Sequence, residues 1–161
     1  MMASRTRLAN DGWEALLSAH ARLMKQFAAE DSWQDLSMRE YDVLYTLSKC
    51  RQPLRMGELH RHVLLSQPAL SRMVDRLVER GLVRRCPDPA DGRGVRLSLT
   101  NSGRDKQRQI GRRHARSVAR AVTAELGPDE LEQLAAICWK LAGRPAATGA
   151  STTDDKELAR T

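Results

Sequence analysis

One segment of the sequence, between Ser66 and Gly81, limits the possible folds more than any other. Its apolar residues recur every three or four positions with polar residues between them, the pattern of a helix with one buried face. Ser66 is a favoured N-cap, Pro68 is tolerated in a first turn, and glycine commonly ends a helix. The segment therefore predicts an amphipathic helix over 67–80. Its apolar positions are Leu70, Met73, Val74 and Leu77, and its outward positions include Gln67, Ser71, Arg72, Asp75 and Arg76.

The segments on either side of this helix predict a second helix and a hairpin. Residues 56–63 suggest a short helix, joined to 67–80 by a tight turn. After Gly81, we expect a strand over 82–86, a loop over 87–94 and a returning strand over 95–99, in which apolar and polar residues alternate. The order is thus helix, turn, helix and β-hairpin with a charged tip.

Helices are expected at both ends of this region. Residues 10–29 carry a broad apolar stripe, and Ser37 with Glu40 has the form of a capping box that opens a second helix ending near Cys50. Thr100 can cap a long helix over 101–126, and Gly127-Pro128 separates it from a last amphipathic helix. Residues 144–161 lack enough apolar surface to offset ordering and predict a flexible tail.

These elements predict a mainly α fold with a small β-hairpin wing, a winged helix-turn-helix whose terminal helices form a dimerisation region. The predicted parts are an N-terminal dimerisation helix in 1–35, a winged lobe in 36–100, a connecting and a C-terminal dimerisation helix in 101–143, and the tail 144–161. The apolar stripes of the terminal helices are broader than one small lobe needs, so a second copy of the chain is the expected partner, although packing within one chain is the alternative.

The charge of the chain is concentrated in its middle. The formal net charge is +7, but residues 55–120 hold 16 basic and 6 acidic residues, so the remainder is slightly acidic. A basic region of this kind favours a polyanionic partner. Because a recognition helix reads bases with residues near its start, Gln67, Pro68, Ser71 and Arg72 are the candidate base contacts in double-stranded DNA. Ser66 and Arg76 suit phosphates.

The expected hairpin tip carries another candidate contact. Arg93 stands between two glycines, so its side chain can reach forward without neighbours, as a minor-groove contact requires. Asp91, two residues earlier, could hold the guanidinium in place. The alternatives are a solvated face for the helix and a plain surface turn for the hairpin.

The sequence resembles the multiple antibiotic resistance regulator (MarR) family of winged-helix repressors. Residues 66–85 are similar to the family's recognition helix and first wing strand, and 87–93 with 97–103 are similar to its wing, including Asp91 and Arg93. The resemblance implies a homodimer that interlocks through its first, fifth and sixth helices and binds a pseudo-palindromic operator. It also implies a small aromatic or anionic effector, for which Trp13, His20 and Met24 are candidate lining residues or plain core.

Other classes of function have weaker support in the sequence. No phosphate loop, nucleophile elbow or carboxylate pair indicates an enzyme or a cofactor, and the four histidines lack ligand-like spacing for a metal. Three cysteines without a C-x-x-C pair favour a reducing, cytoplasmic setting. No continuous apolar segment is long enough for a membrane span, and the N-terminus lacks the apolar core of a signal peptide. Redox sensing through Cys50 or Cys86 and an architectural or protein-interaction module with a basic fifth helix remain the alternatives.

Overall fold

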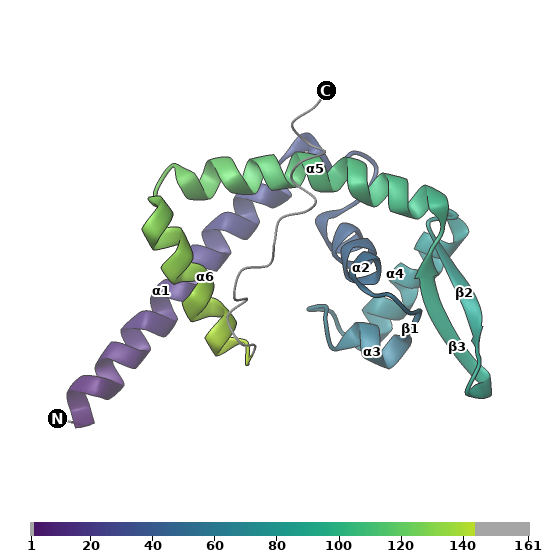
Figure 1. Ribbon diagram of the computed structural model, residues 1–161, viewed down its shortest axis with the longest axis horizontal. Coiled ribbons are helices and arrows are strands. Elements are labelled where there is room, and N and C mark those ends of the chain that lie inside the picture. Colours follow the sequence, from purple (N-terminus) through teal and green to yellow (C-terminus); the bar gives the residue numbers. More distant parts are fainter. Residues whose placement is uncertain (1, 144–161) are drawn as a thin grey trace. The chain divides into compact units, whose positions relative to one another are not determined.

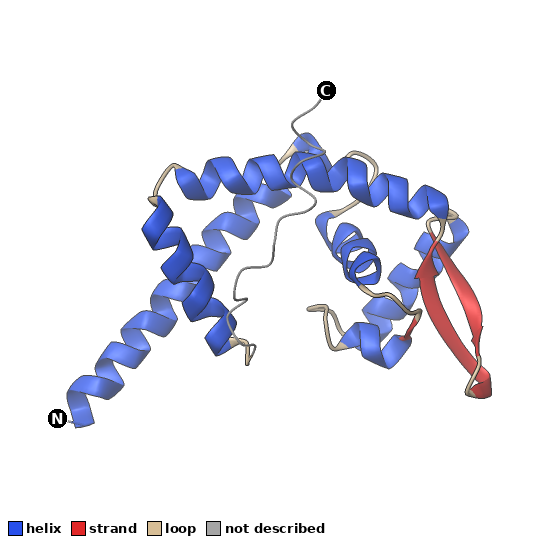
Figure 2. Ribbon diagram, in the orientation of Figure 1, coloured by secondary structure: helices blue, strands red, loops and turns tan. Residues whose placement is uncertain are grey.

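The computed structural model describes residues 2–143, without the side chains of residues 2, 3, 32, 92 and 93, and the predicted tail 144–161 lies outside the described residues. The chain divides into two compact units, 1–118 and 119–161. Helices predominate, with one small sheet, which confirms the predicted fold class (Figures 1 and 2). The elements are α1 (Met2–Ala28), the 3₁₀ turn η1 (Asp31–Trp33), α2 (Met38–Lys49), β1 (Leu54–Arg55), α3 (Met56–His60), α4 (Gln67–Glu79), β2 (Val83–Asp88), β3 (Asp91–Leu99), α5 (Asn101–Thr123) and α6 (Pro128–Leu141).

The core of the first unit is built from aliphatic side chains that the helices and the sheet contribute together. α2 and α4 each bury one face, and β3 adds alternate residues from its inner side. Fully burying a side chain of this size stabilises the folded state by about 1.5–3 kcal/mol relative to leaving it exposed. The largest completely buried side chains are Leu44, Leu59, Leu70, Leu77, Leu97, Ile110, Val43, Val74 and Val83.

The sheet has three antiparallel strands in the order β1-β3-β2, and its hairpin is longer than predicted. β2 pairs with β3 from Val83 opposite Leu99 to Asp88 opposite Asp91, so the turn comprises only Pro89 and Ala90. The predicted loop over 87–94 is therefore wrong. The Asp88 carboxylate accepts the backbone N–H of Ala90 at 3.0 Å, which closes the turn locally.

A third strand, β1, was not predicted. It has only two residues, and Leu54 lies opposite Leu97 of β3. Two residues are too short for any alternation of polar and apolar side chains to be recognised. β1 covers the open edge of β3 and brings Arg55 beside the hairpin.

Caps at the helix ends confirm several sequence predictions. Ser37 and Glu40 form the capping box, with the Ser37 N–H donating to the Glu40 carboxylate at 2.8 Å and the Glu40 N–H donating to Ser37 Oγ at 3.2 Å. Thr100 Oγ1 accepts the N–H of Gly103 at 2.9 Å and so caps α5. Gly81 ends α4 in a left-handed conformation, φ 69°, which glycine adopts without a side-chain clash.

Some helix boundaries differ from those predicted. α1 begins near residue 2 rather than residue 10, because the polar residues before Asn10 form helix without continuing the apolar stripe. α3 ends at His60 rather than Val63, and a His60 ring nitrogen lies 2.9 Å from the carbonyl oxygen of Leu65, so a turn replaces the last part of the predicted helix. α5 ends at Thr123 rather than residue 126.

Four rings join α5 to the rest of the first unit. The ring centroid of His114 of α5 lies 4.8–5.9 Å from those of Phe27 of α1, Trp33 of η1 and Tyr41 of α2. Trp33 Nε1 donates to the carbonyl oxygen of Phe27 at 2.6 Å, so the polar end of the indole is satisfied. This ring cluster fixes the chain between α1 and α2 against α5.

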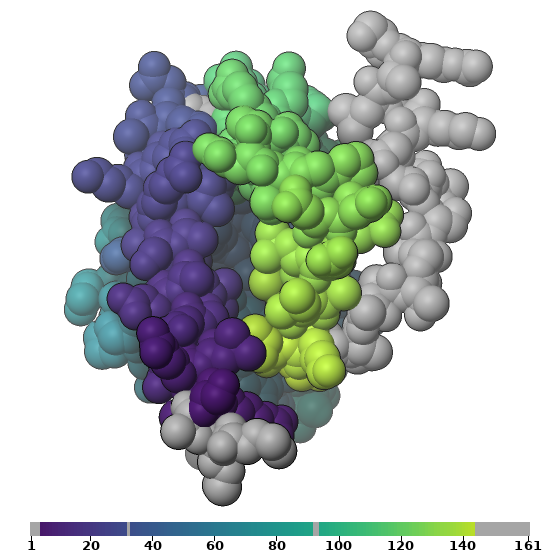
Figure 3. Space-filling view, turned by 90° about the vertical axis from the view of Figure 1, so that its left-hand side faces the viewer, coloured from purple at the N-terminus to yellow at the C-terminus, as the bar shows by residue number. Residues whose placement is uncertain are grey.

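α1 and α6, considered separately, both expose apolar side chains. On α1, Leu8, Trp13 and Leu17 are exposed, and the N-terminal part of this helix, coloured purple, lies on the surface in Figure 3. α6 has no buried residue, and its exposed apolar side chains are Leu134, Ile137, Trp139 and Leu141. Within residues 2–143, no helix combines the length and the apolar character needed to cross a membrane.

Candidate nucleic-acid interface

α4 has the two faces that the sequence predicts. Leu70, Val74 and Leu77 are completely buried and Met73 is 6% exposed, so this side anchors the helix to the lobe. Gln67, Pro68, Arg72 and Arg76 are exposed on the other side. Ser71, predicted to face outward, is only half-exposed.

The start of α4 leaves polar groups available. Ser66 occupies the predicted N-cap position with an extended backbone, φ −68° and ψ 151°, but its side chain makes no capping hydrogen bond, so that part of the prediction is wrong. The exposed hydroxyl and the N–H groups of the first turn therefore have no cap bond from Ser66. Free N–H groups at a helix N-terminus suit an anion such as a phosphate.

Ion pairs hold the C-terminal half of α4 to its neighbours. Arg80 donates to Asp35 at 2.6 Å and lies 3.7 Å from Glu40, and Asp35 also pairs with Lys106 of α5. The hydrogen bond from Lys106 lowers the pKa of the Asp35 carboxyl. Arg76, a predicted phosphate contact, lies 3.8 Å from Glu40 and stays largely exposed. These contacts fix the direction of α4 while its first turns remain open.

Asp75 does not face outward as an independent charge. Its carboxylate pairs with Arg85 of β2, which ties α4 to the hairpin. The pairing neutralises the carboxylate nearest to Arg72 and Arg76. The exposed charges in the first part of α4 are therefore basic, as contact with a phosphate backbone requires, and Glu79 stands exposed only at the end of the helix.

Asp88 organises the base of the hairpin, and the sequence analysis did not identify it. Its buried carboxylate pairs with Arg55 of β1 at 2.5 Å and with Arg96 of β3 at 3.0 Å. The Ala90 N–H and these two guanidinium groups hold the pKa of Asp88 at about 2, against the effect of burial. One carboxylate thus joins all three strands.

The tip of the hairpin is described only in part. The backbone of Arg93 belongs to β3, but its side chain lies outside the described residues, so its reach into a groove stays a prediction. Asp91 is exposed and begins β3. The hydrogen bond to Asp88 raises the pKa of Arg55, and the charge of Asp91 adds a smaller contribution. The predicted contact between Asp91 and the Arg93 guanidinium likewise stays a prediction.

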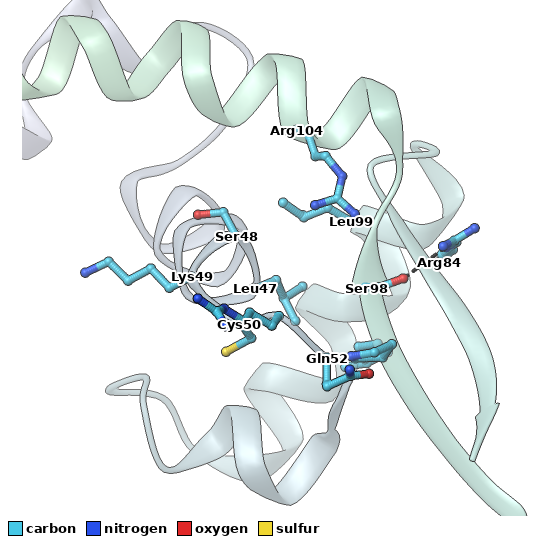
Figure 4. Close-up of a pocket in the computed structure, with 12 residues that line it drawn as sticks. Leu47, Ser48, Lys49, Cys50, Gln52, Arg84, Ser98, Leu99 and Arg104 are labelled. Atoms are coloured by element: carbon cyan, nitrogen blue, oxygen red, sulfur yellow. Dashed lines mark hydrogen bonds between the residues drawn. The ribbon is translucent and has the colours of Figure 1, made fainter. Parts of the chain in front are cut away.

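A hollow of about 400 Å³ lies beside the lobe, between the end of α2, the hairpin strands and the start of α5 (Figure 4). In the close-up, Arg104 points from α5 toward Leu99, whereas the Lys49 side chain extends away from the hairpin strands. Cys50 lines the hollow, and its thiol lies 3.4 Å from the carbonyl oxygen of Thr46. The hollow does not include Trp13, His20 or Met24, the residues considered for an effector.

In the part of the chain that is described, no site for cysteine redox chemistry or metal binding is assembled. Cys50, Cys86 and Cys138 are free and half-buried, and Cys86 Sγ lies 3.6 Å from Ser98 Oγ. Across residues 2–143, no group of three or more His, Cys, Asp or Glu side chains is placed to hold a metal ion.

Comparison with known proteins places this arrangement in a family. The family model described as "MarR family" matches residues 36–95, the region of α2, α3, α4 and the hairpin. The multiple antibiotic resistance protein MarR of Escherichia coli (strain K12) is 31% identical over 107 residues, which cover 66% of this chain and 74% of that protein. The MarR protein of Salmonella typhimurium is 30% identical with the same coverage. The chain belongs to the MarR family.

Solved structures of MarR family members agree with this assignment. Sco3205, a MarR family transcriptional regulator from Streptomyces coelicolor solved in complex with DNA, has a TM-score of 0.70 and 28% identity, covering 83% of this chain and 84% of that one. A mutant MarR from E. coli complexed with operator DNA has a TM-score of 0.68 and 26% identity, covering 80% and 91%. This MarR family member is therefore a winged-helix transcriptional regulator.

Proposed function

We propose that this MarR family regulator is a repressor that binds a pseudo-palindromic operator as a homodimer. In this proposal α4 enters the major groove, where Gln67, Pro68, Ser71 and Arg72 read base edges. Ser66 and Arg76 contact phosphates. At the hairpin tip, Arg93 contacts the minor groove and Asp91 holds its guanidinium group in place.

The observation that carries the proposal is the division of α4 into two faces. Three of its side chains are completely buried, and its exposed side presents Gln67, Arg72 and Arg76. A helix anchored on one side and polar on the other is what major-groove reading requires. The hairpin lies beside the same helix through Asp75 and Arg85, so helix and wing belong to one lobe.

The homodimer is supported by the exposed apolar side chains of α1 and α6. Trp13 is 60% exposed and Ile137 is 58% exposed in the single chain. Exposed apolar surface of this kind marks interaction sites, so each helix is a candidate interface element. With two-fold symmetry, the two copies of α4 would meet half-sites about 34–36 Å apart.

We further propose that a small aromatic or anionic effector controls this regulator, and that it acts on DNA in the cytoplasm rather than as an enzyme. An effector releases DNA only if it binds one dimer geometry more tightly than the other, by a few kcal/mol.

Selection of DNA fragments by the purified protein, followed by competition binding, tests the proposal. A repressor should prefer the selected site over random DNA by ~10³-fold or more at fixed salt, and its mass in solution should be that of two chains. Equal affinity for random DNA would reject it in favour of an architectural protein. Release of DNA by mild peroxide, reversed by a reductant and abolished in a Cys50→Ser, Cys86→Ser variant, would instead identify a redox regulator.

A further inference from the structure

The outward side of α5 in the first unit carries five exposed arginines. This set, called here the arginine face, consists of Arg104, Arg108, Arg112, Arg113 and Arg116. One acidic residue, Asp105, stands among them, and the other exposed residues of this stretch are Asn101, Ser102, Gln109 and Ala115. The surface is therefore strongly basic and has no large apolar side chain.

The opposite side of α5 is fixed to the lobe. Gly103 and Ile110 are buried, and a side chain at Gly111 would meet the hydroxyl of Tyr41 of α2 at 3.0 Å. Lys106 pairs with Asp35 on this side. Because a helix that packs through one side presents the other to solvent, Arg108, Arg112, Arg113 and Arg116 point away from the lobe, whereas Arg104, at the start of the face, points toward Leu99 (Figure 4).

The arginine face does not stabilise the helix that carries it. Arg104, Arg108, Arg112 and Arg116 are spaced four residues apart, so neighbouring side chains bring like charges together. Arg104 also stands in the first turn of α5, where the helix dipole disfavours a cation. The ion pair between Arg108 and Asp105 is long, at 3.9 Å, and Arg116 donates to the backbone carbonyl of Arg112 at 3.2 Å. A helix face that is only solvated is more stable with alternating charges. A binding role therefore explains this row of arginines better than solvation alone.

We propose that the arginine face is a second DNA-binding surface, which contacts the phosphate backbone of a duplex other than the one held by α4. Contact with phosphates needs only positive charge and guanidinium donors, and both are present. An acidic protein partner fits less well, because the centres of protein interfaces are rich in apolar and aromatic side chains, which this face lacks.

The arginine face belongs to the side of α5 opposite its packed side, and α3, which leads into α4, lies beyond α2 (Figure 1). α2 lies between the first part of α5 and α3 in Figure 1, and α5 packs on α2 through Tyr41 and Gly111. Two copies of the arginine face would repel each other, so homodimerisation should leave them free. A dimer holding an operator through α4 can then capture a second duplex.

A bridging experiment with two duplexes tests this inference. One duplex is fixed to beads, and recovery of a second, labelled duplex is measured with wild type and with the Arg108→Gln, Arg112→Gln, Arg116→Gln variant. We expect the variant to capture at least about tenfold less second duplex. The salt dependence of bridging should weaken by about 0.9 in log–log slope for each lost contact. The control, Arg5→Gln, Arg7→Gln, Arg39→Gln, removes the same charge from exposed positions outside α5 and should bridge like wild type.

Two further measurements separate the arginine face from operator binding and from a structural role. The triple variant should bind a single operator duplex within about twofold of wild type, and its melting temperature should equal or exceed that of wild type, because like charges are removed. A wild type that does not bridge, equal bridging by wild type and variant, or weaker single-duplex binding without a bridging defect would each overturn the inference. So would binding of polyglutamate to wild type, lost in the variant, without capture of a second duplex. Bridging without any operator preference would support the second surface but reject the proposed repressor.

Discussion

The backbone carbonyl group of Leu82 lies so close to Gly103 that a Cβ atom at residue 103 would overlap its oxygen. The same oxygen accepts the backbone N–H of Thr100 at 3.1 Å, and the Thr100 hydroxyl donates to the carbonyl of Gly81 at 2.7 Å. The end of α4 and the first strand of the hairpin are thereby fixed to the first turn of α5.

Replacing Gly103 should therefore weaken the fold more than its size suggests. We expect Gly103→Ala to lower the free energy of unfolding by about 1–3 kcal/mol, because the added methyl group meets backbone that cannot rotate away. Gly57→Ala is the matched control: a Cβ atom at residue 57 would have nothing within 4 Å, so this change should stabilise α3 by about 0.5–1 kcal/mol. Urea denaturation of both variants measures the difference. A Gly103→Ala protein as stable as wild type would contradict the packing described.

The parts of the fold that the sequence predicts correctly depend on nearby residues. The two faces of α4 follow from the spacing of Leu70, Val74 and Leu77 within one helix. The caps formed by Ser37 and Thr100 join residues three positions apart. Such signals lie within short stretches of sequence and do not depend on the tertiary structure.

The parts that the sequence analysis missed depend on distant residues. Arg55 and Asp88 are 33 positions apart, and their ion pair forms only when β1 joins β3. Pro87, Asp88 and Pro89 have the composition of a loop. The sequence therefore predicts neither the extension of β2 through these residues nor the role of the Asp88 carboxylate. For the same reason, no local pattern indicates that His114 meets Phe27 and Trp33.

Removal of Arg72 should reduce the selectivity of DNA binding. Arg72 is exposed on α4, and a bidentate arginine contact contributes about 1–3 kcal/mol to discrimination between bases. We expect Arg72→Ala to lose that much operator affinity and to accept substitutions at one base pair of each half-site. Competition binding with single-base variants of the operator measures both effects. The control, Arg39→Ala at an exposed position of α2, should bind as wild type does. Operator binding by Arg72→Ala equal to that of wild type would remove Arg72 from the interface.

Arg93 should affect DNA binding in a different way. Minor-groove arginines respond to groove width, so Arg93→Ala should weaken binding to all sequences and reduce the preference for A·T-rich flanks, where the groove is narrow. Binding to operators with A·T-rich and G·C-rich flanks, at one salt concentration, provides the measurement. If both operators bind the variant as tightly as wild type, the hairpin tip does not contact the minor groove.

Acid should destabilise the hairpin by protonating Asp88. The folded-state pKa is lowered from 3.8 to about 2, so the carboxylate contributes stability above about pH 4, and this contribution is lost as the pH falls toward 2. Asp88→Asn lacks the charge at every pH and leaves Arg55 and Arg96 without their shared anion. The difference in unfolding free energy between wild type and Asp88→Asn should therefore shrink between pH 4 and pH 2. A constant difference over this range would show that the ion pairs do not stabilise the hairpin.

His114 should make the ring cluster sensitive to mild acid. Burial lowers its pKa below 6.5, and the nearby charge of Glu30 only partly opposes this effect. Its Nδ1 atom is buried without a hydrogen-bond partner, as suits a neutral ring among Phe27, Trp33 and Tyr41. Because the unfolded chain binds the proton more readily, stability should be complete above pH 6.5 and should fall as the pH drops toward the folded-state pKa.

The His114→Phe variant isolates this effect, since phenylalanine keeps a ring in the cluster but takes up no proton. Thermal unfolding of wild type and variant is measured from about pH 7.5 to about pH 5, a range that spans the ordinary histidine pKa. The melting temperature of wild type should fall more steeply than that of the variant as the pH decreases. Parallel curves would show that His114 does not take up a proton on unfolding, and that its contacts in the ring cluster do not require the neutral ring.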